Sequence, residues 1–346
     1  MLAGINDQHA QHLRAVERWD AIRAMLPERI DPSASGVTIC SVAYRAKACL
    51  DFNERLMRQL NRGARAAEWL LFDNNVDRAE MIDAADPRFT VVKPQQRDID
   101  MGYEHALGIS ALLARVRTRF LLVLDPDCFV VAPDWLTRIP DHMIANGLGF
   151  FGTPINPRRH NSYRYFPYMV CMFVDLSRVS PRDLCFLPGV WNRSSNVAYR
   201  LRKAIATLPK VGFLFRSLLT EQWRTNGWQI KKRFGGGQLA PFECVQPVWD
   251  VESELAQDPV KRLIHTLTPA SVAPVPKQRG YCSPRGFRTM HAPDVDALGW
   301  EEFVWHDRPF AFHIGSVHAA QPGYLSTLSR VLDGFAARAL DGAPAA

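Results

Sequence analysis

The sequence lacks the glycine-rich motifs that hold phosphates in the commonest nucleotide-binding folds. No GxxxxGK[ST] occurs in its 346 residues, and no GxGxxG follows the first strand-like segment. Such loops approach a phosphate closely because glycine carries no Cβ and because backbone N–H groups point at the anion. The NTPase and the dinucleotide-binding classes therefore lose their main support.

Cysteine pairs at metal-binding spacing are also missing. The seven cysteines are odd in number and scattered, and none forms a CxxC. This usage favours a reducing compartment and makes a zinc site an unattractive interpretation. The cysteines are Cys40, Cys49, Cys128, Cys171, Cys185, Cys244 and Cys282.

Long apolar runs are absent too, since no run approaches the roughly 18 residues that a membrane span needs, and the N-terminus shows no apolar signal segment. We expect a cytoplasmic protein. The formal net charge of +7 favours phosphate-bearing or membrane-surface partners, but the basic residues are too dispersed to identify one, and we expect no nucleic-acid partner. Residues 200–219 mix basic and apolar side chains, as a helix at the inner membrane face would; the alternative is that they pack on their own domain.

The first half of the chain alternates short apolar segments with helical patterns. A parallel α/β sheet with helices on both faces is the fold that this alternation predicts. Ligands bind such sheets outside the carboxyl ends of the strands. The polar residues that end three of the strands, 41–44, 73–75 and 125–127, should therefore share one cleft. We predict strands at 37–44, 68–74, 89–93 and 120–125, and helices at 5–30, 51–62 and 103–116.

The alternation ends near residue 150. Residues 169–176 and 309–317 still indicate strands, and 251–264 indicate a short helix. We divide the chain into a helical arm (1–36), a nucleotide-binding half (37–150) and a more irregular half (151–346). Gly235 to Gly237 could form a loop that closes over a ligand or a plain flexible turn.

Two aspartates interrupt the apolar stretch FLLVLDPDCFVV, residues 120–131. Asp125 and Asp127 are two apart and so can face the same side. Carboxylates at a strand end suit Mg²⁺ or Mn²⁺, which often share their oxygen ligands with substrate phosphates. The alternative is that Asp125 caps a turn and Asp127 is solvated.

These segments together resemble a known family. VTICSVAY, WLLFDNNVD, a helix after Gly102 and FLLVLDPDCFVVAPDWL are similar, in order and spacing, to the N-terminal half of GT-A fold glycosyltransferases, specifically the inverting, DxD-containing, family-2-like group. The resemblance covers residues 37–136 well and the rest loosely. It implies a Rossmann-like, mostly parallel sheet and transfer of a sugar from a nucleotide-sugar donor.

The resemblance also implies roles for individual residues. Ser41, Ala43, Tyr44 and Asp73 would contact the donor's base or ribose. Asp125 would contact the ribose or the metal, and Asp127 would be the direct metal ligand. The family's usual serine in this motif is replaced, since the sequence runs Asp73-Asn74-Asn75-Val76-Asp77, so the base contacts are open.

In many of these enzymes a histidine on a late strand completes the shell around Mn²⁺ or Mg²⁺. His313 fits this role, and His318 is a weaker alternative. A buried histidine bonded to a backbone carbonyl is the competing interpretation of His313. The base that accepts the proton of the acceptor hydroxyl would be Asp250, with Glu252 as alternate; Asp250 could equally be the N-cap of a helix, and the two roles are compatible.

Two other functions compete with glycosyl transfer. A sugar-phosphate nucleotidyltransferase would normally carry a glycine-rich loop after the first strand, and SVAYRAK has none. A non-catalytic nucleotide-sugar or glycan-binding protein would not need the aspartate pair together with a later histidine and carboxylate. For the enzyme, the acceptor could be a polysaccharide or other carbohydrate, a lipid-linked glycan or a small molecule.

Overall fold

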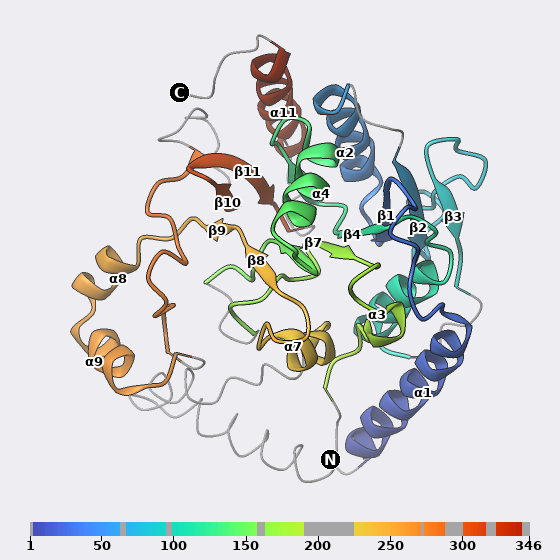
Figure 1. The fold of residues 1–346 in the computed structure, drawn as a ribbon, viewed down its shortest axis with the longest axis horizontal. Coiled ribbons are helices and arrows are strands. Elements are labelled where there is room, and N and C mark those ends of the chain that lie inside the picture. Colours follow the sequence, from blue (N-terminus) through green and yellow to red (C-terminus); the bar gives the residue numbers. More distant parts are fainter. Residues whose placement is uncertain are drawn as a thin grey trace.

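We describe a computed structural model of the chain. It describes residues 3–62, 67–94, 99–157, 163–189, 225–270, 273–287, 300–315 and 323–340. Within these ranges the chain forms two sheets, which meet at the DPD segment, and helices that cover them (Figure 1).

The larger sheet has seven strands in the order β3-β2-β1-β4-β7-β6-β8. The pairs β3-β2, β2-β1, β1-β4 and β6-β8 are parallel, and β7 runs antiparallel to both of its neighbours. This confirms the predicted α/β class with a mostly parallel sheet. The strands are β1 (Val37–Ala43), β2 (Glu68–Asp73), β3 (Thr90–Val92), β4 (Phe120–Leu124), β6 (Phe150–Gly152), β7 (Cys171–Asp175) and β8 (Phe242–Cys244).

The central strands are buried along their whole length because helices cover both faces of the sheet. All seven residues of β1 and all five of β4 are buried. One face packs against α1 (Ala3–Met25), α3 (Met101–Leu113) and α7 (Trp228–Phe234), and the other against α2 (Lys47–Leu60) and α4 (Trp135–Ala145). A short 3-10 helix, η1 (Pro181–Asp183), contacts α1. In Figure 1, α2 and α4 lie above the sheet and α3 and α7 below it.

A second, antiparallel sheet was not anticipated from the sequence. Its order is β5-β11-β10-β9, with β5 (Cys128–Val130), β9 (Gln246–Pro247), β10 (Glu301–Trp305) and β11 (Arg308–His313). The tight turn between β10 and β11 places His306 and Asp307 at φ of 50° and 57°, the left-handed values of a type I′ hairpin. One face of this sheet packs on the α4 side of the large sheet, and the other on α2 and α11 (Tyr324–Leu340). The DPD segment, residues 125–127, thus lies where the two sheets join.

The helix predicted over 251–264 is two helices, α8 (Val251–Gln257) and α9 (Pro259–Leu267). Asp258 ends the first and caps the second, since its side chain accepts from the Lys261 N–H at 2.9 Å. Pro259 follows in the first turn of α9, where its missing N–H costs nothing. The single-helix prediction was wrong because Pro259 cannot continue α8.

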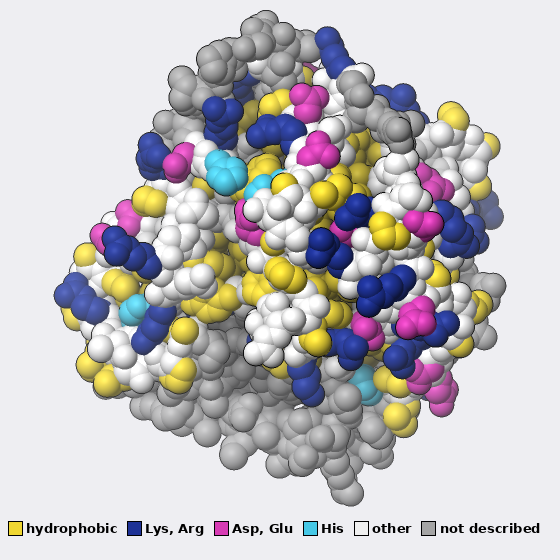
Figure 2. All heavy atoms as spheres, viewed as in Figure 1, with side chains coloured by type: hydrophobic (Ala, Val, Ile, Leu, Met, Phe, Trp, Pro, Cys, Tyr) yellow, Lys and Arg dark blue, Asp and Glu magenta, His cyan; other side chains and the backbone are white. Residues whose placement is uncertain are grey.

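The apolarity of the described helices bears on a membrane span, and the charges on the face in Figure 2 bear on a patch of one sign. In the described part of the chain, no helix combines the length and apolarity that crossing a bilayer requires. On the face shown in Figure 2, basic and acidic side chains are interspersed. The charged side chains visible on this face therefore form no patch of one sign.

Candidate metal and donor site

The DPD segment forms a tight turn at the carboxyl end of β4. The Asp125 N–H donates to the Val170 carbonyl at 2.9 Å, and the Cys128 N–H donates to the Asp125 carbonyl at 3.0 Å. From α2, the buried Asn53 amide donates to the carbonyls of Pro126 (3.3 Å) and Cys128 (2.7 Å). The backbone that carries the two aspartates is therefore held from both sides.

His313 reaches this turn because β11 pairs with β5. Its Cα lies in register with Cys128, and the Ile314 N–H donates to the Asp127 carbonyl at 3.1 Å. One oxygen or nitrogen atom from each of Asp125, Asp127 and His313 lies within 4.8 Å of the others. The structure brings together the three residues that the sequence proposed as metal ligands.

Asp127 and His313 are buried, with 7% and 5% of their surface exposed. The His313 Nε2 lies 3.3 Å from an Asp127 carboxylate oxygen, and its Nδ1 lies 2.9 Å from Glu301. Burial by itself lowers the pKa of His313, but the two carboxylates outweigh burial and raise this pKa to about 10. Asp127 is buried, so it is not the solvated aspartate of the alternative interpretation. His313 contacts two carboxylates, so it is not a histidine bonded to a backbone carbonyl.

The donor atoms of this cluster fit a hard or borderline divalent cation. Two carboxylates supply oxygen, as Mg²⁺ and Mn²⁺ prefer, and the imidazole nitrogen suits Mn²⁺ better than Mg²⁺. The Glu301 carboxylate holds the other imidazole nitrogen at 2.9 Å, which is the usual arrangement behind a metal-bound histidine. A divalent cation here would also offset most of the negative charge of the three neighbouring carboxylates, Asp125, Asp127 and Glu301.

Two residues of this cluster were missed by sequence reasoning. Glu301, on β10, lies opposite His313 in register and orients its ring. His105, on α3, places its Nε2 3.8 Å from an Asp125 oxygen. A single glutamate before a strand and a single histidine in a helix give no local signal. The spacing of Glu301 and His313 about the β10–β11 turn could have identified the first.

The predicted donor contacts fall into buried and exposed groups. The Ser41 hydroxyl, 0% exposed, donates to the Leu124 carbonyl at 2.6 Å and accepts from the Trp69 indole at 3.1 Å. It joins β1 to β4 and does not open onto the cleft. Ala43 is buried, whereas Tyr44 is 39% exposed and stacks with Arg45, whose guanidinium lies 5.5 Å from the ring.

Asp73 organises the loop that follows β2. One carboxylate oxygen accepts from the Asn75 backbone N–H (3.2 Å) and side-chain amide (2.8 Å), and the other from the Ile82 N–H (3.2 Å). The Asn75 amide oxygen accepts in turn from the Arg45 N–H at 2.6 Å. Asp73 is 1% exposed, so its carboxylate lies under the surface and holds the loop next to Tyr44 in place.

Asp250 is the N-cap of α8, as one of its two sequence interpretations holds. Its carboxylate accepts from the Ser253 N–H at 2.9 Å, and both Asp250 and Glu252 are exposed. The Val248 N–H donates to the Glu302 carbonyl at 2.9 Å, and the neighbouring Glu301 faces His313 in register. The chain therefore leaves β9 toward Asp250 at the same end of the small sheet as the candidate metal site.

Two sequence proposals concern residues outside the described ranges: His318 and the basic–apolar segment 200–219. In the glycine run, Gly235 ends α7 and Gly237 adopts a φ of 73°, so this part is a turn after a helix.

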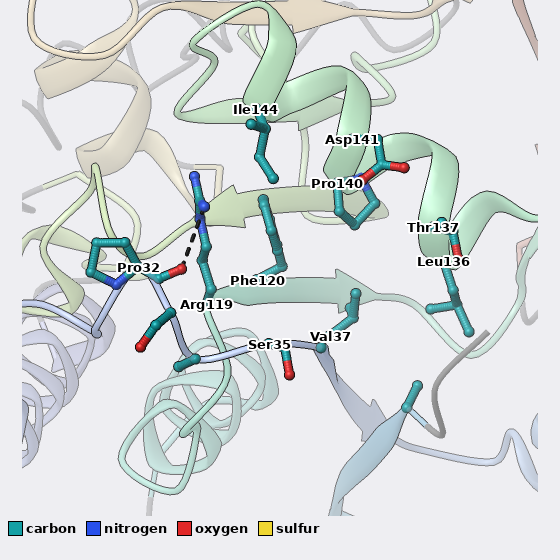
Figure 3. A pocket seen from close by; sticks show the side chains of 14 residues that line it. Pro32, Ser35, Val37, Arg119, Phe120, Leu136, Thr137, Pro140, Asp141 and Ile144 are labelled. Carbon is teal, nitrogen blue, oxygen red and sulfur yellow. Dashed lines mark hydrogen bonds between the residues drawn. The ribbon is translucent and has the colours of Figure 1, made fainter.

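A cavity of about 410 Å³ lies at the opposite, amino edge of the large sheet (Figure 3). It is bounded by the first residues of β1 and β4 and by α4. Its arginine, Arg119, is bound by the buried Asp175 at 2.8 Å and also donates to the Pro32 carbonyl at 3.5 Å. The cavity and the aspartate pair are thus at opposite ends of the parallel strands.

No family model matches the sequence, and no curated protein matches it. The solved structures that resemble the chain include a mannosyltransferase from Pyrobaculum calidifontis with GDP-Man and Mn²⁺ (12% identity, 58% of this chain and 64% of that chain, TM-score 0.34). Another is S. aureus TarS 1-349 with UDP-GlcNAc (8% identity, 58% of this chain and 73% of that chain, TM-score 0.31). A third is mouse xyloside xylosyltransferase 1 (10% identity, 61% of this chain and 85% of that chain, TM-score 0.29). The chain thus spans less than two thirds of the mannosyltransferase.

Proposed function

We propose that this protein is a metal-dependent, inverting glycosyltransferase that moves a sugar from a nucleotide-diphosphate sugar to an acceptor hydroxyl. The observation that carries the proposal is the meeting of Asp125, Asp127 and His313 at the carboxyl edge of the parallel strands. That edge is where open α/β sheets bind their ligands. Residues 37–150 would hold the donor, and 151–346 the acceptor.

In this proposal the donor lies across the ends of β1, β2 and β4. Asp127 and His313 would hold Mn²⁺ or Mg²⁺, with Asp125 as a third ligand or a ribose contact. When bound, the cation offsets the charge that develops on the leaving diphosphate. The base and ribose would meet the exposed Tyr44, the backbone of Ala43 and the rim that Asp73 orders, while Ser41 ties β1 to β4 below them.

Asp250 is proposed to accept the proton of the attacking hydroxyl, with Glu252 as alternate. The acceptor oxygen attacks the anomeric carbon, the bond to the diphosphate breaks, and the anomeric configuration inverts. Asp250 is suited to this by its exposure and by its place at the metal end of the small sheet. Its hydrogen bond to the Ser253 N–H occupies one carboxylate oxygen and leaves lone pairs on the other.

Nucleotide-sugars incubated with the protein in Mn²⁺ or in EDTA test this function. We expect thermal stabilisation and slow release of nucleoside diphosphate that both require the metal, and an inverted anomeric centre in the transfer product by NMR. Diphosphate formed from an NTP and a sugar phosphate would instead indicate a nucleotidyltransferase. Binding of nucleotide-sugars without any turnover would indicate a non-catalytic protein.

A further inference from the structure

A second cavity, of about 680 Å³, lies beside strand β8; we call it the β8 cavity. Its size is within the range of small-molecule sites. It lies between the end of α7, strand β8, the start of β9, Tyr165 and the loop 277–281.

The walls of the β8 cavity are joined by hydrogen bonds between distant parts of the chain. The Tyr165 hydroxyl accepts from the Lys277 N–H at 2.9 Å, and the Tyr281 hydroxyl accepts from the Tyr165 N–H at 3.3 Å. The two tyrosine rings meet at 4.7 Å, and the Gln246 amide donates to the Gly280 carbonyl at 2.6 Å. A cavity held this way needs little ordering when a ligand enters.

Strand β8 lies at the edge of the large sheet and offers its backbone to this cavity. It pairs with β6 alone in the described sheet, and the Val245 N–H donates to the Gly152 carbonyl at 3.0 Å. Because alternate residues of a strand direct their backbone groups to opposite sides, Phe242 and Cys244 direct theirs away from β6. Both line the cavity, so hydroxyl groups of a ligand would find donors and acceptors there.

The charged groups that line the cavity favour an anion. Glu243 also lines the cavity, but its carboxylate contacts the His142 Nε2 at 2.8 Å and accepts from the Trp305 indole at 3.0 Å. Lys277 and Arg279 line the cavity, and neither lies at ion-pair distance from a carboxylate in the described part of the chain. The Lys277 ammonium donates to the Thr266 carbonyl at 3.3 Å.

The cavity is connected to the candidate active site by strand β9. Gly152 and Cys244 are in register, so β8 ends at the carboxyl edge of the sheet, as β4 does. The chain then runs from Gln246 in the cavity to Asp250 at the metal end of the small sheet. Four residues of extended chain span about 13 Å, which exceeds the size of one sugar ring.

We propose that the β8 cavity binds an anionic group, a carboxylate or a phosphate, on a part of the acceptor at least one sugar unit away from the reacting hydroxyl. This rests on the proposed glycosyltransferase function. Lys277 and Arg279 would hold the anion, Tyr165 and Tyr281 would contact the sugar ring, and the β8 backbone would bind its hydroxyls. The acceptor class would then be an acidic glycan.

Binding of three probes by calorimetry tests the proposal: trigalacturonic acid for a carboxylate glycan, mannose 6-phosphate for a phosphate, and neutral maltotriose. We expect one or both acidic probes to bind and maltotriose to bind at least tenfold more weakly. The variant K277Q/R279Q should lose at least tenfold in acidic-probe affinity. The control K232Q/R308Q removes the same charge from exposed positions outside the cavity and should change it less than twofold.

Other results would overturn the proposal. One is that maltotriose binds as tightly as the acidic probes, and another is that neither acidic probe binds. A third is that K277Q/R279Q binds the acidic probes as tightly as the unchanged protein does. A fourth is that a nucleoside diphosphate displaces trigalacturonic acid, which would make the cavity a donor site. Release of nucleoside diphosphate from the donor is measured in parallel. Acidic-probe binding without any such release would contradict the proposed function and leave the anion site standing.

Discussion

The two proposed catalytic carboxylates, Asp127 and Asp250, lie in opposite environments. Asp127 is 7% exposed and lies on a turn that Asn53 and two sheets hold in place. Asp250 is exposed at the start of α8, a helix with no buried residues. The proposed metal ligand is thus pre-positioned, whereas the proposed base lies on a helix with no buried residues. This contrast predicts that the proposed donor site around Asp127 is rigid and that the proposed acceptor site around Asp250 changes conformation when an acceptor binds.

The largest effect should come from Asp127→Ala. It removes a proposed metal ligand, and metal stabilisation of the leaving group contributes several kcal/mol, so transfer should fall by about 10³-fold. Mn²⁺-dependent donor binding, measured by calorimetry, should disappear as well. Asp141→Ala, at the exposed edge of the amino-side cavity, is the matched control and should keep both. Full activity of Asp127→Ala would refute the metal site.

Asp250→Asn should leave donor binding intact and slow transfer by about 10²- to 10⁴-fold, the usual contribution of a general base. The asparagine can still cap α8, so loss of rate without loss of stability would separate the base role from the cap role. Glu252→Gln is the companion variant. If it slows transfer and Asp250→Asn does not, Glu252 is the base.

Glu301→Gln should weaken Mn²⁺ affinity by about 10- to 100-fold, since it alters the partner that orients His313. The readout is Mn²⁺ titration of the protein without donor, which does not depend on turnover. The exposed Glu28→Gln provides the charge-matched control. Unchanged affinity would mean that His313 is held by β11 alone.

The smallest effect on the site should come from Asn53→Leu. It removes the donor that two turn carbonyls use, so the free energy of unfolding should fall by about 1–3 kcal/mol. Because β5–β11 pairing still holds the turn, Mn²⁺ affinity should change less than tenfold. Chemical denaturation and Mn²⁺ titration of the same sample check both statements. A larger loss of affinity than of stability would show that Asn53, not the sheet, sets the turn.

The sequence predicts the central strands of the large sheet well and the strands of the small sheet poorly, for a physical reason. Strands such as β1 and β4 are buried on both faces and read as continuous apolar runs, and the carboxyl edge follows from their direction. The strands β5 and β9 are two or three residues long and are defined by partners far along the chain. No local pattern marks such segments.

The same distinction holds within the site. Asp125 and Asp127 were proposed because they interrupt an apolar segment at its end, whereas His313 was proposed from the resemblance to the glycosyltransferase family. Ser41 and Asp73 were expected at the cleft from their places at strand ends, but the side chains of both are buried and bonded within the protein. Position in a strand predicts the edge of the sheet; whether a side chain points into solvent depends on neighbours such as Trp69, which the strand pattern does not show.

The pairing of β5 with β11 has a consequence for how the molecule folds. Cys128 and His313 are partners although more than half of the chain separates them. Contacts between such distant segments are slow to form, because the intervening loop must close first. The proposed metal site can therefore form only after the C-terminal strands have docked. The rate at which Mn²⁺ binding appears during refolding would therefore report the rate at which these strands dock.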